Sequence, residues 1–472
     1  MDCTVTAAIS STKTINALST PANRKITNLT TLNPICSQNK PKSSDFYASN
    51  NFLNPSKSRN PYFRNKSSKL SVVHCSRKPN TDRENATDEN LSSLQPSSNS
   101  RIQEQTTAAS PTTNQGISLN PSFSRGLVFD LGLKKDSSWD SAEIGSPVVK
   151  RFLGDEEERW YMWYRGRRSN GNDSIGLALS NNGIHWERGE GAVKSSSDVG
   201  MVMNCSDDWW AFDTRGIRPS EVVIMSSTKV RVNNSLYWLY YTGFNDEKIE
   251  SLEFKLKKAL PGLAMSQDGR HWARIEGEHH SGALFDVGSK GEWDSLFISS
   301  PQVVYHGAGD MRMYYHSFDA EKGHFAVGIA RSRDGMKWVK LGKILGGDGN
   351  GMFDEVGVMN ANVVKNRKDG KYLMAYEGVG ADGRRSIGLA ISSDGLKEWR
   401  RFQNGPVLEQ SEEDGWDCEG VGSPCLVQMD GNADEWRLYY RGIGKGGKTG
   451  IGLAVCQGTE FASFQRWTGF HL

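Results

Sequence analysis

Several carboxylates of this 472-residue chain lie at spacings that could serve acid–base chemistry. They stand in or just after an aromatic–Asp pair that recurs five times along the chain. A positioned carboxyl group can give or take a proton during a reaction. The candidate catalytic residues are Glu143, Glu355 and Glu419, together with Asp140 and Asp213 from the aromatic–Asp pairs.

A second set of polar residues occupies one equivalent position in the five repeats, before a recurring glycine. This position reads Arg165, Thr242, His316, Glu377 and Arg441. Unlike residues at equivalent points indicate a specific ligand. The alternative is ion pairing between neighbouring repeats, such as Glu377 with Arg441. The predicted substrate-binding residues are Arg165, Arg215, Arg218, His316, Glu377 and Arg441.

Basic residues in nearby loops favour an anionic ligand such as a sugar phosphate, a uronic acid or phosphate itself. They are Arg167, Arg168, Arg384, Arg385, Lys445 and Lys448. The alternative is that these basic residues form a solvated rim and bind no ligand. We expect no cofactor and no metal site: His279–His280 lacks a third ligand, and the glycine-rich stretch 442–447 joins two strands and opens no helix.

The repeat itself predicts the fold. Gly-(Leu/Ile)-Ala begins at residues 176, 262, 328, 388 and 452, and four copies continue into a Ser…Gly…Trp turn. Asp-Gly or Asn-Gly between apolar runs is a strong hairpin signal. An aromatic run and an apolar strand precede each copy, so each unit holds four short strands.

Four-stranded units at this spacing predict an all-β, five-bladed β-propeller. The expected blades cover residues 138–196, 210–285, 292–345, 350–409 and 415–467. The segment 126–130 matches the end of a blade and should close the ring by joining the last one. Two packed sheets are the alternative.

The repeated pattern resembles the five-bladed propellers of arabinanases, invertases, levansucrases and mannoside phosphorylases, over residues 121–472. The resemblance implies a ligand site at one mouth of the propeller, with acid–base groups at Asp140 or Glu143, Asp213 and Asp294. The chain departs from the pattern: no Glu lies near the third inner strand, and Cys418–Glu419 reverses the invertase order.

The resemblance therefore implies a glycoside hydrolase or glycoside phosphorylase acting on a carbohydrate. Two other hypotheses remain open: a propeller that binds carbohydrate without cleaving it, and a scaffold that contacts a protein partner through its rim.

The N-terminal quarter differs in composition from the rest. Residues 1–75 are basic and rich in hydroxyl groups, which predicts a plastid (chloroplast) transit peptide. Residues 76–120 are polar and predict a disordered linker. All 14 Trp follow residue 120, and residues 121–472 carry a net charge of −5. That acidic body argues against nucleic-acid binding, and no apolar run suggests a membrane span.

Overall fold

The computed structural model describes most of the chain beyond residue 124. The described ranges are 125–131, 138–153, 158–225, 236–249, 257–307, 309–347, 351–430, 434–458, 461 and 463–469. The predicted transit peptide and linker lie outside them. The prediction of an all-β chain is confirmed: the described elements are 22 strands and one short 3-10 helix, Lys445–Gly447.

The first two repeats each form an antiparallel sheet. The first sheet contains β2 (Glu143–Leu153), β3 (Glu158–Arg167), β4 (Ser174–Ser180), β5 (Glu187–Arg188) and β6 (Gly200–Met203), with β6 paired to β4. The second contains β7 (Gly216–Met225), β8 (Leu236–Lys248), β9 (Lys257–Ser266) and β10 (Ala273–Ile275).

The third and fourth repeats share one eight-stranded sheet. Its strands are β11 (Ser299–Tyr305), β12 (Met311–Asp319), β13 (His324–Ser332), β14 (Trp338–Gly346), β15 (Gly357–Lys365), β16 (Tyr372–Val379), β17 (Arg385–Ser392) and β18 (Arg400–Arg401). One parallel pair, Phe325 with Gly357, joins β13 to β15. The two halves are otherwise separate antiparallel units.

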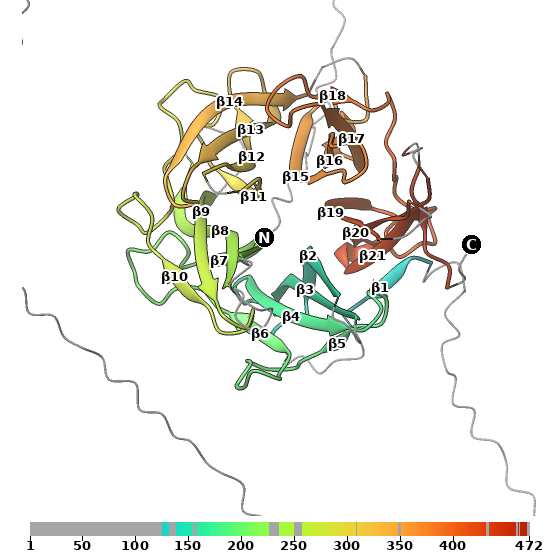
Figure 1. The fold of residues 1–472 in the computed structure, drawn as a ribbon, viewed down its shortest axis with the longest axis horizontal. Coiled ribbons are helices and arrows are strands. Elements are labelled where there is room, and N and C mark those ends of the chain that lie inside the picture. Colours follow the sequence, from blue (N-terminus) through green and yellow to red (C-terminus); the bar gives the residue numbers. More distant parts are fainter. Residues whose placement is uncertain are drawn as a thin grey trace, which may run out of the picture. The chain divides into compact units, whose positions relative to one another are not determined.

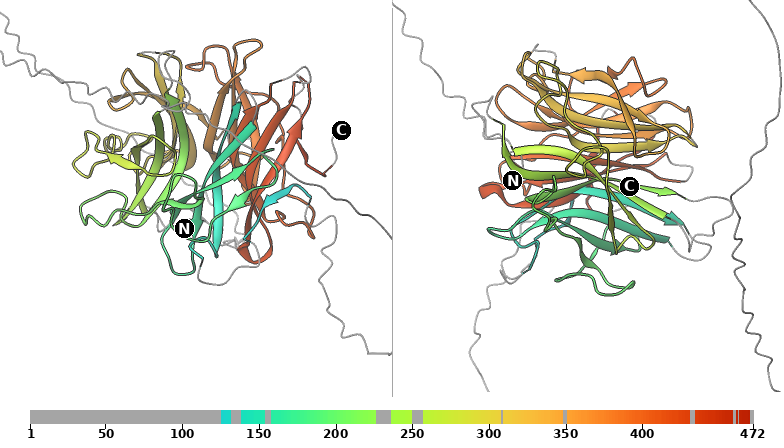
Figure 2. Two further views of the ribbon diagram at one scale, coloured as in Figure 1. Left: turned by 60° about the horizontal axis from the view of Figure 1, so that its bottom comes forward. Right: turned by 90° about the vertical axis from the view of Figure 1, so that its left-hand side faces the viewer.

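The last sheet combines both ends of the described chain. It contains β19 (Gly420–Gln428), β20 (Trp436–Ile443), β21 (Thr449–Cys456) and β22 (Gln465–Arg466), and β1 (Leu127–Phe129) pairs with β21. The sheets are arranged around a common centre, with β2, β7, β11, β15 and β19 innermost (Figure 1). We call these five the inner strands; seen from the side, strands of neighbouring sheets lie next to one another (Figure 2).

Each aromatic–Asp pair packs against its own sheet. Phe353 stacks on Tyr376, with ring centroids 6.1 Å apart, and Trp416 stacks on Tyr440 in the same way. The recurring glycines make this approach possible: a Cβ at Gly388 would lie 2.6 Å from the Phe353 ring. Glycine is needed here because no side chain fits beneath the ring.

The aspartates of these pairs are buried and hold each sheet together. Each accepts a hydrogen bond from a tyrosine of the second strand, at 2.8 to 3.0 Å. Each also pairs with a cation of the outermost strand. The five sets are Asp140–Tyr164–Arg188, Asp213–Tyr241–Arg274, Asp294–Tyr315–Lys340, Asp354–Tyr376–Arg401 and Asp417–Tyr440–Arg466.

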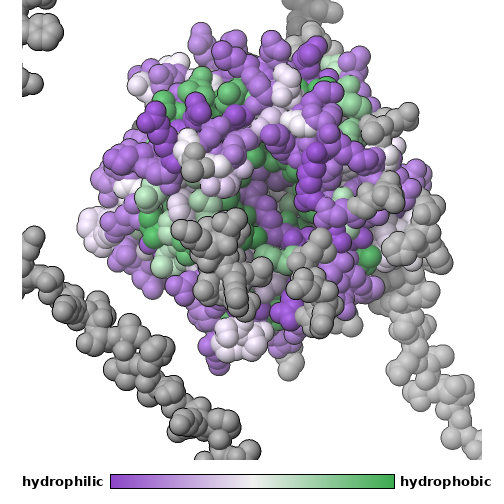
Figure 3. Space-filling view, viewed as in Figure 1, coloured by the Kyte–Doolittle hydropathy of each residue, from purple (hydrophilic) through white to green (hydrophobic). Residues whose placement is uncertain are grey.

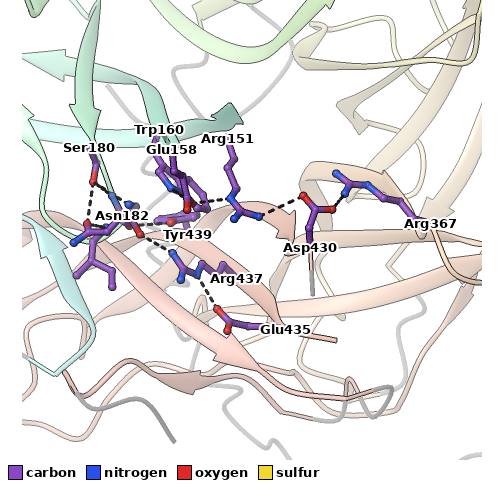
Figure 4. Close-up of polar contacts among 12 residues, drawn as sticks. Arg151, Glu158, Trp160, Ser180, Asn182, Arg367, Asp430, Glu435, Arg437 and Tyr439 are labelled. Carbon is purple, nitrogen blue, oxygen red and sulfur yellow. Dashed lines mark hydrogen bonds and ion pairs between the residues drawn. The ribbon is translucent and has the colours of Figure 1, made fainter. Parts of the chain in front are cut away.

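Turns connect neighbouring sheets. In the Ser…Asp-Gly turn, serine and aspartate oxygens accept backbone N–H groups, as at Ser332 and Asp334. The glycine carbonyl then accepts a side-chain donor from the preceding sheet: Tyr240 donates to Gly335 at 3.1 Å. The first and last sheets meet in the same way, because Tyr439 donates to Gly183 at 2.8 Å (Figure 4).

Within the described ranges, no helix is long and apolar enough to cross a membrane.

Candidate functional site

The inner strands share a bulge at one level. Each shifts register against its second strand there. In four of them a non-glycine residue adopts a left-handed backbone conformation: Ser146 (φ 47°), Ser300 (53°), Asn360 (50°) and Ser423 (46°). The equivalent residue of β7 is Pro219. We call these five the bulge residues. Strained backbone of this kind costs about 1–3 kcal/mol per residue and often marks functional sites.

The bulge residues line a pocket where the inner strands converge, which we call the axial pocket. The space-filling view is hollowed at the centre around which the sheets are arranged (Figure 3). The other lining residues are Arg218, Ser299, His316, Met359, Arg385 and Arg441. Arginine, histidine and hydroxyl groups therefore dominate the lining.

Residues at the ends of the second strands hold the bulges in place. The backbone N–H of Ser300 donates to Thr242 Oγ1 at 2.8 Å. That of Asn360 donates to His316 Nδ1 at 3.3 Å. Thr242 and His316 thus each hold the inner strand of the next repeat. Glu377 does the same for β19, because it accepts a hydrogen bond from the Ser423 N–H.

Glu377 is buried and links two repeats. Its carboxylate accepts hydrogen bonds from Asn360 Nδ2 at 2.7 Å, from the Ser423 N–H at 2.9 Å and from Arg385 at 2.7 Å. Burial opposes its charge, but Arg385 and Arg441 together with these hydrogen bonds lower the pKa of Glu377 below its usual value. The carboxylate is therefore ionised at neutral pH.

Asp173 holds the other side of the pocket. It pairs with Arg218 at 2.7 Å and lies 3.6 Å from the buried Arg165. Burial opposes ionisation, yet these two arginines lower the pKa of Asp173 well below its usual range. Glu143 also pairs with Arg165, at 2.8 Å, and with Arg167. Arg218 thus reaches the pocket from an anchored position.

His316 is neutral at physiological pH. Burial, with Arg218 and Arg385 nearby, lowers its pKa to about 4 despite the attraction of Glu377. Because Nδ1 accepts a hydrogen bond, the proton of the neutral ring is assigned to Nε2.

The charges of this cluster do not balance. The arginines are Arg165, Arg167, Arg218, Arg385 and Arg441, and the carboxylates are Glu143, Asp173 and Glu377. Counted over these described residues alone, five cations stand against three anions, with His316 neutral. A partly enclosed positive site attracts anions.

The predicted site residues divide into two groups. Arg218, His316 and Arg441 line the axial pocket. Glu377 and Arg165 lie behind this lining: Glu377 pairs with Arg385, and Arg165 is linked to Arg218 through Asp173 and also binds Glu143.

The other five predicted residues do not line this pocket. Arg215 pairs with Asp246 on the surface. Glu419 is exposed and accepts the Gly446 N–H at 3.3 Å, and Glu355 is partly buried beside β15. Asp140 and Asp213 belong to the buried tyrosine–aspartate–arginine sets.

Sequence reasoning missed Asp173 and the bulge serines. Asp173 lies in the loop before β4, outside the recurring motifs, so comparison of the repeats did not single it out. The serines carried a signal, because Ser-Pro recurs at Ser146, Ser300 and Ser423. That dipeptide marks the bulge in three of the five inner strands.

Comparisons with known proteins support the fold more than a reaction. No protein-family model matches the chain. Two uncharacterized proteins of Mycobacterium tuberculosis, from strains CDC 1551 and H37Rv, are each 29% identical over 254 residues, which is 52% of this chain and 73% of the relative.

Similar solved structures are carbohydrate-active proteins. An N-acetylgalactosamine deacetylase from F. plautii, in complex with blood group B trisaccharide, matches with a TM-score of 0.50 at 14% identity, covering 72% of this chain and 96% of that one. A structure from the GH130 family of mannoside phosphorylases matches with a TM-score of 0.45 at 16% identity, covering 71% and 92%. At these identities the deacetylase match shows a shared fold.

Proposed function

We propose that this chain is a glycoside-acting enzyme, a hydrolase or a phosphorylase, whose axial pocket binds an anion. The anion is either part of the carbohydrate or phosphate as the attacking group. The observation that carries the proposal is the convergence of Arg218, Arg385 and Arg441 with His316 and the bulge serines. We also propose that the five repeats are the blades of one propeller, closed by β1.

The composition of the pocket suits an oxyanion. A guanidinium group presents several N–H donors in one plane and binds carboxylate or phosphate with two parallel hydrogen bonds. Asp173 and Glu377 orient Arg218 and Arg385 in advance. Neutral His316 and the hydroxyl groups of Ser146, Ser299 and Ser423 add donors without further charge, whereas the Ser300 hydroxyl already donates to Asn360 Oδ1 at 2.7 Å.

Proton transfer falls to carboxylates outside these ion pairs. Nearby arginines and hydrogen bonds lower the pKa of Glu377, which makes it a poor acid, and Glu143 is paired with Arg165. Glu355 and Glu419 have no ion-pair partner among the residues that the structure describes. We propose Glu355 or Glu419 as the proton donor.

A second candidate function is carbohydrate binding without turnover. The pairing of Glu143 and Glu377 with arginine favours it, because two-carboxylate hydrolysis needs one carboxyl group that holds a proton. Assays for turnover and for binding separate the two functions.

The test uses the purified full chain. Sugar release is measured from α- and β-linked arabinosides, fructosides, mannosides and phosphorylated sugars, with and without inorganic phosphate. Release that depends on phosphate identifies a phosphorylase, and release without it identifies a hydrolase. Absence of release from every substrate contradicts the enzymatic proposal.

Amino-acid substitutions test whether anion binding and turnover depend on the residues proposed here. Arg441→Ala should weaken anion binding at least tenfold, whereas Arg384→Ala, at an exposed position beside the pocket, should change it less than twofold. Glu355→Gln or Glu419→Gln should abolish turnover and retain binding. Equal effects of the two arginine variants would place the anion elsewhere.

We further propose plastid import. A fusion of residues 1–75 to a fluorescent protein should enter chloroplasts of plant cells, and a fusion that remains in the cytosol would contradict this.

A further inference from the structure

The axis carries a second concave site, which we call the axial funnel. The inner strands begin at the axial pocket and run away from it, so residues farther along each strand lie toward the opposite face. The funnel is lined by residues from the later halves of these strands, chiefly 221–224, 302–305 and 362–365, with Lys150 and Cys425.

Polar side chains form the floor of the funnel. Glu221, Gln302 and Asn362 occupy equivalent positions in β7, β11 and β15 and are buried. The equivalent residue of β2 is Val148, which is also buried. Buried polar groups at a position that accepts valine need hydrogen-bonding partners.

Gln302 has one side-chain atom that no described residue satisfies. Its Nε2 donates to Glu221 Oε2 at 2.8 Å and to the Val363 carbonyl at 3.1 Å. Both partners are acceptors, so the orientation of the amide is fixed. Its Oε1 is buried and receives no hydrogen bond from the described residues. The floor therefore has an acceptor that requires a donor.

The floor carries no net charge. Lys150 Nζ lies 2.5 Å from Glu221 Oε1, and the Val222 N–H donates to the same oxygen at 2.9 Å. In the other sheets the position of Lys150 is occupied by valine, so this lysine serves to neutralise Glu221. A ligand therefore does not need to bring a charge.

The walls are formed mainly by apolar residues. Val223, Val304 and Val364 line the funnel, Tyr305 at its edge is 44% exposed, and the exposed Lys365 is the one charged residue of this lining outside the Lys150–Glu221 pair. Apolar walls around a few converging polar groups are typical of small-molecule sites.

We propose that the axial funnel binds an uncharged small molecule with an apolar body and a hydrogen-bond-donating head. The head donates to Gln302 Oε1, and the body packs against the valines. The funnel and the axial pocket share no lining residue, although a cavity between them is lined by the bulge residues and by Asn362. The proposal for the funnel does not depend on the function proposed for the axial pocket.

The test compares three probes of equal shape on the full chain: cyclohexanol, cyclohexylammonium and cyclohexanecarboxylate. Dissociation constants are measured by ligand-observed NMR at neutral pH. Cyclohexanol should bind at least fivefold more tightly than either charged probe. Gln302→Leu should weaken cyclohexanol binding at least fivefold, whereas Gln465→Leu, on the exposed strand β22, should leave it unchanged.

Val304→Trp provides an independent variant, since it fills the funnel without removing a hydrogen bond. It should abolish cyclohexanol binding in a protein whose circular dichroism and Tm match the parent. The proposal is overturned if cyclohexanol does not bind, if the carboxylate or ammonium probe binds most tightly, or if Val304→Trp binds cyclohexanol as the parent does.

Discussion

His316 shows how one residue can serve both structure and ligand binding. Its Nδ1 accepts the N–H of Asn360, which holds the bulge of β15, and the ring also lines the axial pocket. The structural role requires a neutral ring, because protonated Nδ1 cannot accept a hydrogen bond. The energetic consequence is a dependence of stability on pH.

We predict that this residue makes the fold less stable between pH 6.5 and 4. Its pKa is about 4 in the folded protein, against about 6.5 in an unfolded chain. The unfolded state therefore binds a proton first as the pH falls, and stability is lost over this window. His316→Gln should show a shallower slope of unfolding free energy against pH, measured by urea denaturation.

His185→Gln provides the control, since His185 is exposed. Its slope should match that of the parent. Equal slopes for His316→Gln and the parent would show that His316 does not titrate in this way.

At the scale of elements, the repeated motifs serve to pack each sheet together. The aromatic ring of each pair lies against glycines of its sheet, and the neighbouring aspartate ties the second strand to the outermost one. The two motifs that are most visible in the sequence, aromatic–Asp and Gly-(Leu/Ile)-Ala, are therefore two sides of one contact.

Gly388→Ala tests this contact. The new methyl group would lie 2.6 Å from both the Phe353 and Tyr376 rings. Overpacking of this kind costs about 1–3 kcal/mol, so Tm should fall by several degrees. Gly405→Ala is the matched control because no atom lies within 4 Å of its new Cβ; a similar Tm for the two variants would contradict the packing role.

At the scale of the molecule, contacts between the first and last sheets join distant parts of the chain. Arg437 donates to the Asn182 carbonyl at 2.8 Å, beside the bond from Tyr439 to Gly183 (Figure 4). On the same side, Arg151 of β2 lies 3.4 Å from Asp430, which follows β19. These contacts span more than 250 residues of sequence.

Tyr439→Phe should weaken this junction. The buried Gly183 carbonyl would lose its side-chain donor, which costs about 1–3 kcal/mol. Thermal unfolding should show a lower Tm, and Tyr305→Phe, at an exposed site, should not. An unchanged Tm for Tyr439→Phe would mean that the junction adds little to stability.

The sequence by itself determined the class of fold. Strand periodicity, turns with a glycine at positive φ, such as Gly335, and the spacing of the repeats are local properties, and local sequence carries them. It also indicated Arg218, His316 and Arg441 as candidates, because departures from a repeat can be read without coordinates.

Only the tertiary structure decided which charges meet. Asp173 pairs with Arg218 across 45 residues of sequence, and Glu377 holds the Ser423 N–H across 46. Such contacts depend on how neighbouring sheets pack, which spacing along the chain does not encode. The same reason applies to the axial funnel, because only the packing of the sheets places Lys150 against Glu221 and leaves Gln302 Oε1 without a donor among the described residues.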